Sequence, residues 1–434
     1  MTIKSEQWLI LAYIFNVDGK AASLTITDRI PLLLKNNISP IVISAITGSK
    51  DDRFIHHRIF SCMPSGLQYE LRFLLKKSRM QKWLRELLKG LLTLTLLPFY
   101  LLERIFIHLD THWSWGLSSA FQGVISLIRY RPTILYSTAG PSSTHLAGYL
   151  LHKISNIPWI AEIHDPLIYD IEKRKWHQRY IFHNWLEKKI CTHAAAVIYF
   201  TEHALKSADQ RHPIQGEKII IRPGAAPPAT PGITYKQKDT IHFGHFGSLA
   251  PTRNLSKFIE SLHLLIKKQP KLQELIVVDI YGSGLDDISR KALRQFPLPH
   301  VLIEHGRLEY DKTTGKTGRR QAIEAMKLSD VLIILHGSGV ICEEYIPSKV
   351  YEYLLSERPI LALTGDSSEL AKIIIECDHH IVSPDDTSAI QNAINQYIEK
   401  WRNNSLQNNL RHSPYTIERT VTTLLNISQK IQLQ

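Results

Sequence analysis

Short apolar runs alternate with longer segments of helical periodicity along the first half of the chain. The apolar runs, which we interpret as strands, cover residues 8–15, 40–45, 133–136, 159–163 and 195–200. Helical patterns lie between them, among others at residues 22–35, 144–154 and 183–191. A strand–helix alternation of this kind predicts a parallel sheet covered by helices.

A segment rich in proline and glycine divides the chain. Residues 222–232 hold four prolines and two glycines, which sustain neither helix nor strand. The alternation then resumes, with expected strands at residues 241–246, 275–281, 301–304, 331–335 and 359–363. We predict four parts: a domain over 1–221, a linker over 222–238, a second domain over 239–400, and a helical tail over 401–434 whose expected place is back on the first domain.

Composition and length fit this division. A chain of 434 residues suits two domains, or three at most. Hydrophobic residues make up 44%, and 8 Trp, 17 Tyr and 13 Phe supply aromatic side chains to bury, which argues against a disordered chain. None of the 4 cysteines belongs to a CxxC pair. A disulfide scaffold and a cysteine zinc site are therefore not expected, and a reducing compartment fits best.

The charge balance points to an anionic partner. Lysine and arginine exceed aspartate and glutamate by 12, and such an excess favours nucleic acid, anionic lipid or a phosphorylated small molecule. Nucleic acid is the weakest of the three, because no recognised nucleic-acid-binding motif is present. No metal is expected either, since the pairs His56–His57 and His379–His380 are adjacent rather than spaced for one helix face.

Residues of about 70–110 combine positive charge with apolar character. No secretory signal pattern is recognisable, and the longest uncharged apolar stretch, residues 90–102, is shorter than the roughly 18 residues of a membrane span. The basic residues upstream are Arg72, Lys76, Lys77, Arg79, Lys82, Arg85 and Lys89. This pattern predicts a helix that lies in the interface of an anionic membrane. The alternative is a core helix followed by a solvated face.

The first candidate site follows the expected strand at 241–246. Gly247 and Ser248 let backbone N–H groups approach a ligand closely, and Arg253 precedes a helix that starts near Leu255. A guanidinium at that position can hold a phosphate through two hydrogen bonds. The alternative is a tight turn with a solvated arginine.

The second candidate site lies after the strand at 331–335. Glu344 and Glu352 are eight residues apart, and Ser348 stands where it can help cap the helix that carries Glu352. Lys349 falls in the first turn, where a cation is unfavourable beside the helix dipole unless an anion is bound. This local conflict indicates a binding site. The alternative is a Glu–Lys pair on a solvated helix face.

A third candidate site follows the strand at 159–163. His164 and Asp165 come directly after it, where side chains lining a ligand cleft are expected. The loop at 137–145, which ends in His145, closes another strand and opens a helix. The alternative is that Asp165 and Pro166 only begin a turn.

At these motifs the chain resembles glycosyltransferase family 4, retaining enzymes of the GT-B fold, and within it members that build bacterial surface polysaccharides. Glu344 and Glu352 are similar to the E-x7-E motif of that family, and residues 346–353 to its PSK…EY variant. Residues 243–253 resemble its phosphate loop, and residues 138–165 its segment before the cleft. The resemblance implies an α/β fold with two Rossmann-like domains that face each other across a cleft.

The resemblance also implies roles for the donor side. Arg253 and Lys349 would neutralise the diphosphate of a nucleotide-sugar donor, with Lys257 as a further cation. Glu352 would bind the ribose hydroxyls, and Glu344 the donor sugar. Three smaller residues would complete the donor-binding set: Gly247, Ser248 and Ser348.

On the acceptor side, the resemblance implies that His164 faces the reacting carbon and that Gly19 opens the site, with His145 and Asp165 beside them. Such enzymes need no metal or other cofactor. The implied function is the transfer of a sugar to a glycan acceptor, lipid-linked on account of the segment at 70–110. The pathway would be surface polysaccharide or lipopolysaccharide synthesis, in the cytoplasm at the inner face of the cell membrane. Two alternatives stay open: a nucleotide-sugar epimerase of the same architecture, and a non-enzymatic, membrane-associated binding protein.

Overall fold

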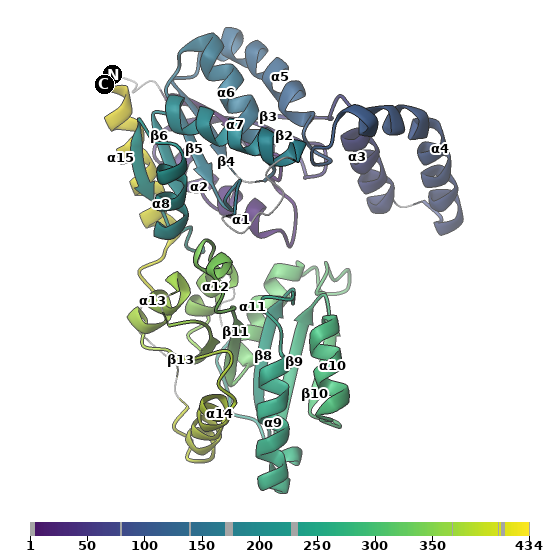
Figure 1. Ribbon diagram of the computed structural model, residues 1–434, viewed down its shortest axis with the longest axis vertical. Helices are drawn as coiled ribbons and strands as arrows, with labels where there is room; N and C mark the ends of the chain where they lie inside the picture. The colour runs from purple at the N-terminus through teal and green to yellow at the C-terminus, as the bar shows by residue number, and fades with distance from the viewer. Residues whose placement is uncertain are drawn as a thin grey trace. The chain divides into compact units, whose positions relative to one another are not determined.

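The computed structural model describes residues 5–78, 80–138, 140–169, 177–226, 233–366, 368–406, 408 and 413–433. They form two compact units, each built on its own sheet (Figure 1). The first unit comprises Met1–Arg222 and Ile417–Gln434, and the second comprises Pro223–Thr416. The chain returns to the first unit at Ile417, later than the expected start of the tail at residue 401. Residues 227–232 of the expected linker lie outside the described residues.

The first unit contains a parallel sheet in the order β3-β2-β1-β4-β5-β6-β7. Its strands are β1 (Glu6–Leu11), β2 (Ile38–Ala45), β3 (Ile55–Ile59), β4 (Ile134–Thr138), β5 (Trp159–Ile163), β6 (Ala196–Tyr199) and β7 (Glu217–Ile220). Its helices are α1 (Ala21–Thr27), α2 (Ile30–Lys35), α3 (Pro64–Lys77), α4 (Lys82–Phe106), α5 (Trp115–Tyr130), α6 (Ser143–Ser155), α7 (Gln178–His193), α8 (Glu202–Arg211) and α15 (Ile417–Gln432). Strand order reverses between β1 and β4, which is where such sheets bind ligands, beyond the carboxyl ends of the strands.

The second unit contains a parallel sheet in the order β10-β9-β8-β11-β12-β13. Its strands are β8 (Ile241–Gly247), β9 (Ile276–Gly282), β10 (Leu302–Gly306), β11 (Val331–Leu335), β12 (Ile360–Leu363) and β13 (His380–Val382). Its helices are α9 (Ser256–Lys268), α10 (Asp287–Gln295), α11 (Gly318–Leu328), α12 (Lys349–Leu355), α13 (Glu369–Glu376) and α14 (Thr387–Arg402), with 3₁₀ turns η1 (Pro270–Glu274) and η2 (Val340–Glu343). Here the order reverses between β8 and β11. Two doubly wound units confirm the predicted fold class.

Two predicted elements differ in extent from the structure. The strand expected at 8–15 ends at Leu11. The single helix expected at 22–35 is two helices, α1 and α2. Pro31 explains the break, because proline has no N–H to donate to the carbonyl one turn earlier. Three strands escaped prediction, namely β3, β7 and β13.

Helices α3 and α4 form a hairpin that extends away from the sheet of the first unit (Figure 1). Buried carboxylates fix its base. Glu103 accepts hydrogen bonds from Ser65 N at 2.8 Å, Ser65 Oγ at 2.6 Å and Trp113 Nε1 at 2.8 Å. Glu70 accepts from Ser61 N at 2.8 Å and Ser61 Oγ at 2.7 Å, and burial raises its pKa. Among the residues of α4 only Glu103 is buried, so the alternative of a core helix is wrong for this segment.

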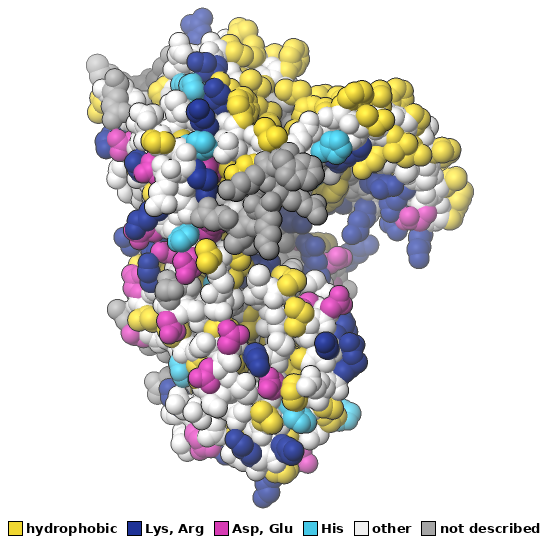
Figure 2. Space-filling model, viewed as in Figure 1, with side chains coloured by type: hydrophobic (Ala, Val, Ile, Leu, Met, Phe, Trp, Pro, Cys, Tyr) yellow, Lys and Arg dark blue, Asp and Glu magenta, His cyan; other side chains and the backbone are white. Residues whose placement is uncertain are grey.

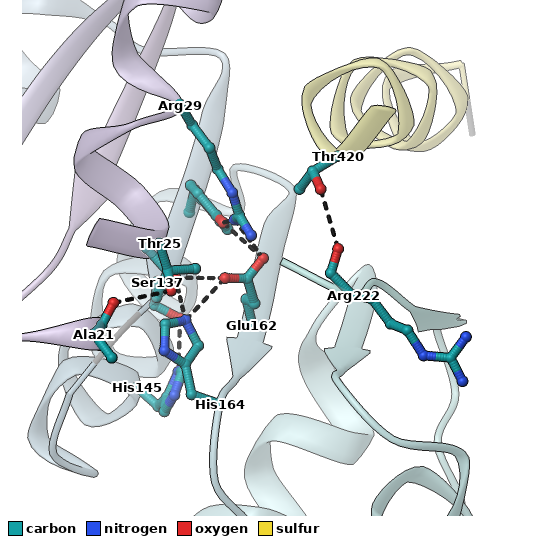
Figure 3. A network of polar contacts seen from close by, with 11 residues as sticks. Ala21, Thr25, Arg29, Ser137, His145, Glu162, His164, Arg222 and Thr420 are labelled. Atoms are coloured by element: carbon teal, nitrogen blue, oxygen red, sulfur yellow. Dashed lines mark hydrogen bonds and ion pairs between the residues drawn. The ribbon is translucent and has the colours of Figure 1, made fainter. Parts of the chain in front are cut away.

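Helix α15 packs within the first unit. Thr420 Oγ1 donates to the carbonyl oxygen of Arg222 at 3.1 Å (Figure 3). Further along the helix, Lys430 Nζ lies 2.7 Å from Glu217 Oε2, at the start of β7. The C-terminal helix therefore borders the edge strand β7, although the whole second unit separates the two in sequence.

Candidate functional site

The second unit has a pocket at the point where its strand order reverses. The loops after β8 and β11 line a cavity of about 250 Å³, with Arg253, Lys257, His336, Gly337 and Ser338 among its walls. Ligand sites for drug-sized molecules are commonly about 300–1,000 Å³. The cavity is therefore smaller than a typical site for a drug-sized ligand.

Arg253 is a cation in the wall of this pocket. Its Nε atom is buried, and no acceptor among the described residues bonds to it. A buried donor without an acceptor costs about 1–3 kcal/mol unless a ligand satisfies it. Burial and the charge of Arg253 both lower the pKa of His336, to about 4, so this neighbour stays neutral at pH 7. Lys257 is more exposed and pairs with Glu260 at 2.9 Å.

Two glycines stand where β8 and β11 end, and of these two Gly337 lines the pocket. Gly247 ends β8 with φ of 146°, a conformation that side chains rarely adopt, and a Cβ there would meet open space. Gly337 has a different reason to be glycine, because a Cβ would lie 2.6 Å from the carbonyl oxygen of Thr252. The loop after β11 can thus approach the loop after β8 only without a side chain. Ser248 follows Gly247 and is exposed.

Glu352 joins two cations at the start of α12. Its Oε2 lies 2.6 Å from Lys349 Nζ, and its Oε1 lies 2.9 Å from Arg319 Nε. Glu352 is only 8% exposed. Burial alone would raise its pKa, but the two cations outweigh that effect and hold the pKa below its usual value. The expected Glu–Lys pair is therefore present, although the carboxylate is buried rather than solvated.

Arg319 escaped prediction, and the sequence offered only a weak signal for it. Arg319 lies in the first turn of α11, just as Lys349 lies in the first turn of α12. A cation in the first turn is unfavourable because of the helix dipole. The partner of Arg319, Glu352, is 33 residues away in sequence. Lys349 and Arg319, each in the first turn of its helix, both pair with the carboxylate of Glu352. The negative charge of Glu352 offsets the unfavourable position of each cation beside its helix dipole.

Two further residues predicted for the donor side, Glu344 and Ser348, precede α12 in the chain. Glu344 follows the 3₁₀ turn η2 and is 2% exposed. Ser348 is the N-cap residue of α12 but has helical backbone angles, and its side chain makes no capping hydrogen bond. The predicted capping role of Ser348 is therefore wrong. Its exposed hydroxyl leaves it available for other contacts.

In the first unit, His164 belongs to a buried polar network (Figure 3). The centre of that network is Glu162, which is fully buried at the end of β5. Its carboxylate accepts hydrogen bonds from Arg29 at 2.7 Å, Tyr136 at 2.9 Å, Thr138 at 2.8 Å and His164 at 2.9 Å. Burial would raise the pKa of Glu162, but Arg29 and His164 hold it well below its usual range.

This network selects one tautomer of His164. Because Glu162 is an ionised acceptor, the Nε2 atom of His164 that faces it carries the proton. Thr138 Oγ1 donates its own proton to Glu162 and lies 3.1 Å from the same Nε2. In the neutral form of the ring, the Nδ1 atom carries the lone pair and can accept a hydrogen bond from a hydroxyl group. The ring also packs on Phe200, with centroids 4.5 Å apart.

His145 lies beside His164 and stays neutral (Figure 3). Trp159 Nε1 donates to Ser137 Oγ at 2.8 Å, and the Ser137 hydroxyl is hydrogen-bonded to His145 Nδ1 at 2.9 Å. Burial and the neighbouring His164 together lower the pKa of His145 to about 3. His145 is therefore a positioned, uncharged ring rather than a proton donor.

The other acceptor-side residues are exposed. Gly19 follows β1 with φ of 66°, in a turn that leads into α1. Asp165 is exposed directly after His164. Arg29, Tyr136 and Glu162 escaped prediction. The signal for Glu162 was a single charge inside the otherwise apolar run 159–163, which demands a buried partner.

The structure thus groups the predicted residues within each unit. In the second unit, Arg253 and Lys257 line the pocket, and Lys349 meets Glu352. In the first unit, His145 and His164 belong to one buried cluster. Within the described part of the chain, no group of three or more His, Cys, Asp or Glu side chains could hold a metal ion.

Comparisons with known proteins give a fold but not a family. No family model matches the sequence, and no curated protein matches it. Solved structures match over the whole chain, at low identity. Trehalose 6-phosphate synthase from Burkholderia multivorans has a TM-score of 0.62 at 9% identity and covers 99% of both chains.

Two further structures are similar over the same extent. HepE from Anabaena, solved with UDP and glucose, has a TM-score of 0.54 at 13% identity and covers 98% of both chains. WaaG, a glycosyltransferase involved in lipopolysaccharide biosynthesis, has a TM-score of 0.56 at 11% identity and covers 96% of this chain and 99% of its own. These matches, with the two doubly wound sheets, show that the chain has the GT-B fold of glycosyltransferases.

Proposed function

We propose that the protein is a glycosyltransferase that moves a sugar from a nucleoside diphosphate to a glycan acceptor. The observation that carries this proposal is the unsatisfied, buried Nε of Arg253 in the pocket at the β8–β11 switch point. A diphosphate oxygen supplies the acceptor that Arg253 lacks. Structures of the same fold that hold UDP and glucose support the choice of ligand.

Lys349 has a second role in this proposal. In the unliganded protein it pairs with Glu352, which Arg319 also holds. The Lys349 side chain is about one-third exposed, so it can turn toward a diphosphate while Arg319 keeps Glu352 ionised. Glu352 then has an oxygen free to accept from the ribose hydroxyls, and Glu344 is assigned to the donor sugar.

The proposed chemistry is transfer with retention, as in glycosyltransferase family 4. Cleavage of the sugar–phosphate bond leaves negative charge on the diphosphate and positive character on the sugar ring. Fixed cations aimed at the leaving group stabilise that separation without a metal. The leaving phosphate accepts the proton of the acceptor hydroxyl, which attacks from the same face. His164, with its free Nδ1 lone pair, is assigned to orient a sugar hydroxyl.

A lipid-linked acceptor at the inner face of the cell membrane is part of the proposal. Helix α4 exposes a row of leucine, isoleucine and aromatic side chains, for example Leu94 at 68% and Ile105 at 65%. No helix in the described ranges has both the length and the apolar character needed to cross a bilayer. The exposed row instead suits a helix lying in the membrane interface. The proposed pathway is surface polysaccharide synthesis with a lipid-linked acceptor. WaaG, which has a similar structure, is involved in lipopolysaccharide biosynthesis.

Nucleotide binding is the first test. We expect UDP, or one other nucleoside diphosphate of a panel with GDP, CDP and ADP, to raise the melting temperature. A ligand that binds only the folded state raises the free energy of unfolding by about 2.7 kcal/mol at a concentration of about 100 times its Kd. Lys349→Ala should abolish the shift. Lys372→Ala is the matched control, because Lys372 also pairs with a buried glutamate, Glu369, at 2.9 Å in a neighbouring helix.

Product analysis separates the transferase from its rivals. With the shifting nucleotide sugar and a lipid-linked glycan, the proposal expects nucleotide release that depends on the acceptor, and a product with the donor's anomeric configuration. An inverted sugar nucleotide formed without acceptor would indicate an epimerase. If neither product forms and no nucleotide raises the melting temperature, the candidate function that remains is a membrane-associated binding protein.

A further inference from the structure

The hairpin of α3 and α4 encloses a groove that the proposed transfer reaction does not use. Its volume is about 750 Å³, within the range of small-molecule sites. Basic and aromatic side chains line it from both helices: Tyr69, Arg72, Phe73, Lys76, Lys89 and Tyr100. Ser65 and Thr111 line it at the base of the hairpin, where Glu103 fixes the two helices.

The charges of this groove are only partly compensated. Glu86 is a carboxylate in its lining and bonds to Lys89 at 2.8 Å, a contact that lowers the pKa of Glu86. Arg72 donates to the neutral hydroxyl of Thr93 at 2.6 Å. No carboxylate among the described residues pairs with Arg72 or Lys76. These two cations, one helical turn apart on α3, are available to an anion.

An apolar surface borders the groove on the same helix. Along α4, Glu86, Lys89, Thr93 and Tyr100 face the groove, whereas a second row, offset around the helix, is apolar and exposed. That row consists of Leu87, Leu91, Leu94, Leu101 and Ile105, at the three- and four-residue spacings of one helix face.

The apolar surface continues onto α5. Phe121 and Ile128 are 73% and 75% exposed there, with Leu117 and Ile125 in the same row. Figure 2 shows hydrophobic side chains gathered over the upper side of the hairpin and Lys and Arg side chains along its underside. An apolar surface of this extent on two neighbouring helices marks an interaction site rather than scattered exposure.

We propose that the α3–α4 groove binds the phosphate head group of an anionic lipid, with Arg72 and Lys76 on the phosphate. The acyl chains would lie along the apolar rows of α4 and α5. This inference deepens the proposed membrane association and rests on it. A lipid is the occupant that fits, because a soluble phosphate would leave the apolar rows uncovered, whereas a purely apolar partner would leave the cations uncompensated.

Direct binding tests the groove. Isothermal titration would use dihexanoyl phosphatidic acid below its micelle concentration, with inorganic phosphate and dihexanoyl phosphatidylcholine as comparison ligands. We expect phosphatidic acid to bind at a single site and more tightly than either comparison. The double variant Arg72→Gln/Lys76→Gln should weaken it by about tenfold or more, the loss expected for charge-assisted hydrogen bonds.

The matched control removes the same charge from the same hairpin. Lys77 and Lys82 are exposed on α3 and α4 and do not line the groove. Lys77→Gln/Lys82→Gln should bind phosphatidic acid like the unaltered protein. Equal weakening in both double variants would show diffuse electrostatic attraction and overturn the proposal. Inorganic phosphate that binds as tightly as the lipid would also overturn it.

Failure of this inference is distinguishable from failure of the proposed function. Arg72 and Lys76 are exposed and lie in the first unit, whereas the nucleotide pocket lies in the second. The groove variant should keep the full thermal shift with nucleotide, which also shows that it folds. If no nucleotide raises the melting temperature of the unaltered protein, the proposed transferase function is refuted. Lipid binding is then judged by the titration with phosphatidic acid alone.

Discussion

Arg29 and Glu162 form an ion pair at 2.7 Å in which neither side chain is exposed to solvent. They are 133 residues apart in sequence, and Tyr136 bridges them by accepting from Arg29 at 2.6 Å and donating to Glu162 at 2.9 Å. The pair anchors α2 near the carboxyl ends of β4 and β5. It also supplies the carboxylate that His164 contacts at 2.9 Å, so the stability of the fold and the position of His164 depend on the same pair.

Removing one partner of this pair should be costly. We expect Arg29→Met to lower the free energy of unfolding by about 3–5 kcal/mol, because it leaves Glu162 buried without its cation. Urea denaturation measures the change. Lys50→Met is the control, since Lys50 pairs with Asp52 at 2.7 Å with both side chains exposed, and such pairs contribute about 0–1 kcal/mol. Equal losses in the two variants would contradict the role assigned to the buried pair.

Buried histidines should make the fold sensitive to mild acid. Burial lowers the pKa of His56, His245, His336 and His379 to about 4 and of His145 to about 3. In the unfolded chain each titrates near 6.5, so the unfolded state binds more protons below that pH. Stability is complete above about pH 6.5 and falls as the pH drops toward 4.

One variant isolates this effect. At pH 5, each histidine that stays neutral in the folded state should lower the free energy of unfolding by up to about 2 kcal/mol relative to pH 7. His56→Gln removes one titrating group, so unfolding free energies measured between pH 7.5 and 5 should show a shallower slope. The slope, and not the absolute stability, is the readout. An unchanged slope would show that His56 does not titrate differently in the folded and unfolded states.

Central strands were predictable because burial on both faces makes them almost continuously apolar. Residues 159–163 and 331–335 were predicted with the bounds that the structure gives to β5 and β11. Edge strands carry weaker patterns. β3 has the sequence IHHRI, in which His56 is buried against Ser44 although histidine is polar. The central strands alone were enough to predict the fold class. The strands that were missed, β3, β7 and β13, lie at the edges of the sheets and do not change the order of the central strands.

The candidate site was predictable where a motif is local and not where a partner is distant. Arg253, Lys349 and Glu352 lie beside strand ends or helix starts that the sequence indicates. Glu162 could be suspected from a charge in an apolar strand, but nothing local identifies Arg29 as its partner. The cap predicted at Ser348 failed because that residue has helical backbone angles, whereas a capping residue is normally extended.

Gly337 offers a sharp test of diphosphate binding in the pocket that the loops after β8 and β11 line. A methyl group at this position would lie 2.6 Å from the carbonyl oxygen of Thr252, so Gly337→Ala must separate the loops after β8 and β11. We expect nucleotide affinity to fall by about tenfold or more by titration calorimetry. Gly339→Ala is the control in the same loop, because a Cβ there meets nothing within 4 Å. Unaltered affinity in the Gly337 variant would place the diphosphate elsewhere.

Glu103 should hold the α3–α4 hairpin in place. Its carboxylate accepts from Ser65 N, Ser65 Oγ and Trp113 Nε1. Ser65 Oγ also donates to the carbonyl oxygen of Thr111 at 3.2 Å, so Glu103→Ala leaves two donors, Ser65 N and Trp113 Nε1, without an acceptor at the base of α3 and α4. Each such donor costs about 1–3 kcal/mol. Because the groove depends on the distance between the helices, local opening there should precede global unfolding. Amide exchange should therefore quicken across residues 64–106 with little change in β4 and β5. Glu86→Ala, which removes an exposed carboxylate from the same helix, should leave exchange unaltered, and equal acceleration in both variants would show that the hairpin has no buried anchor at Glu103.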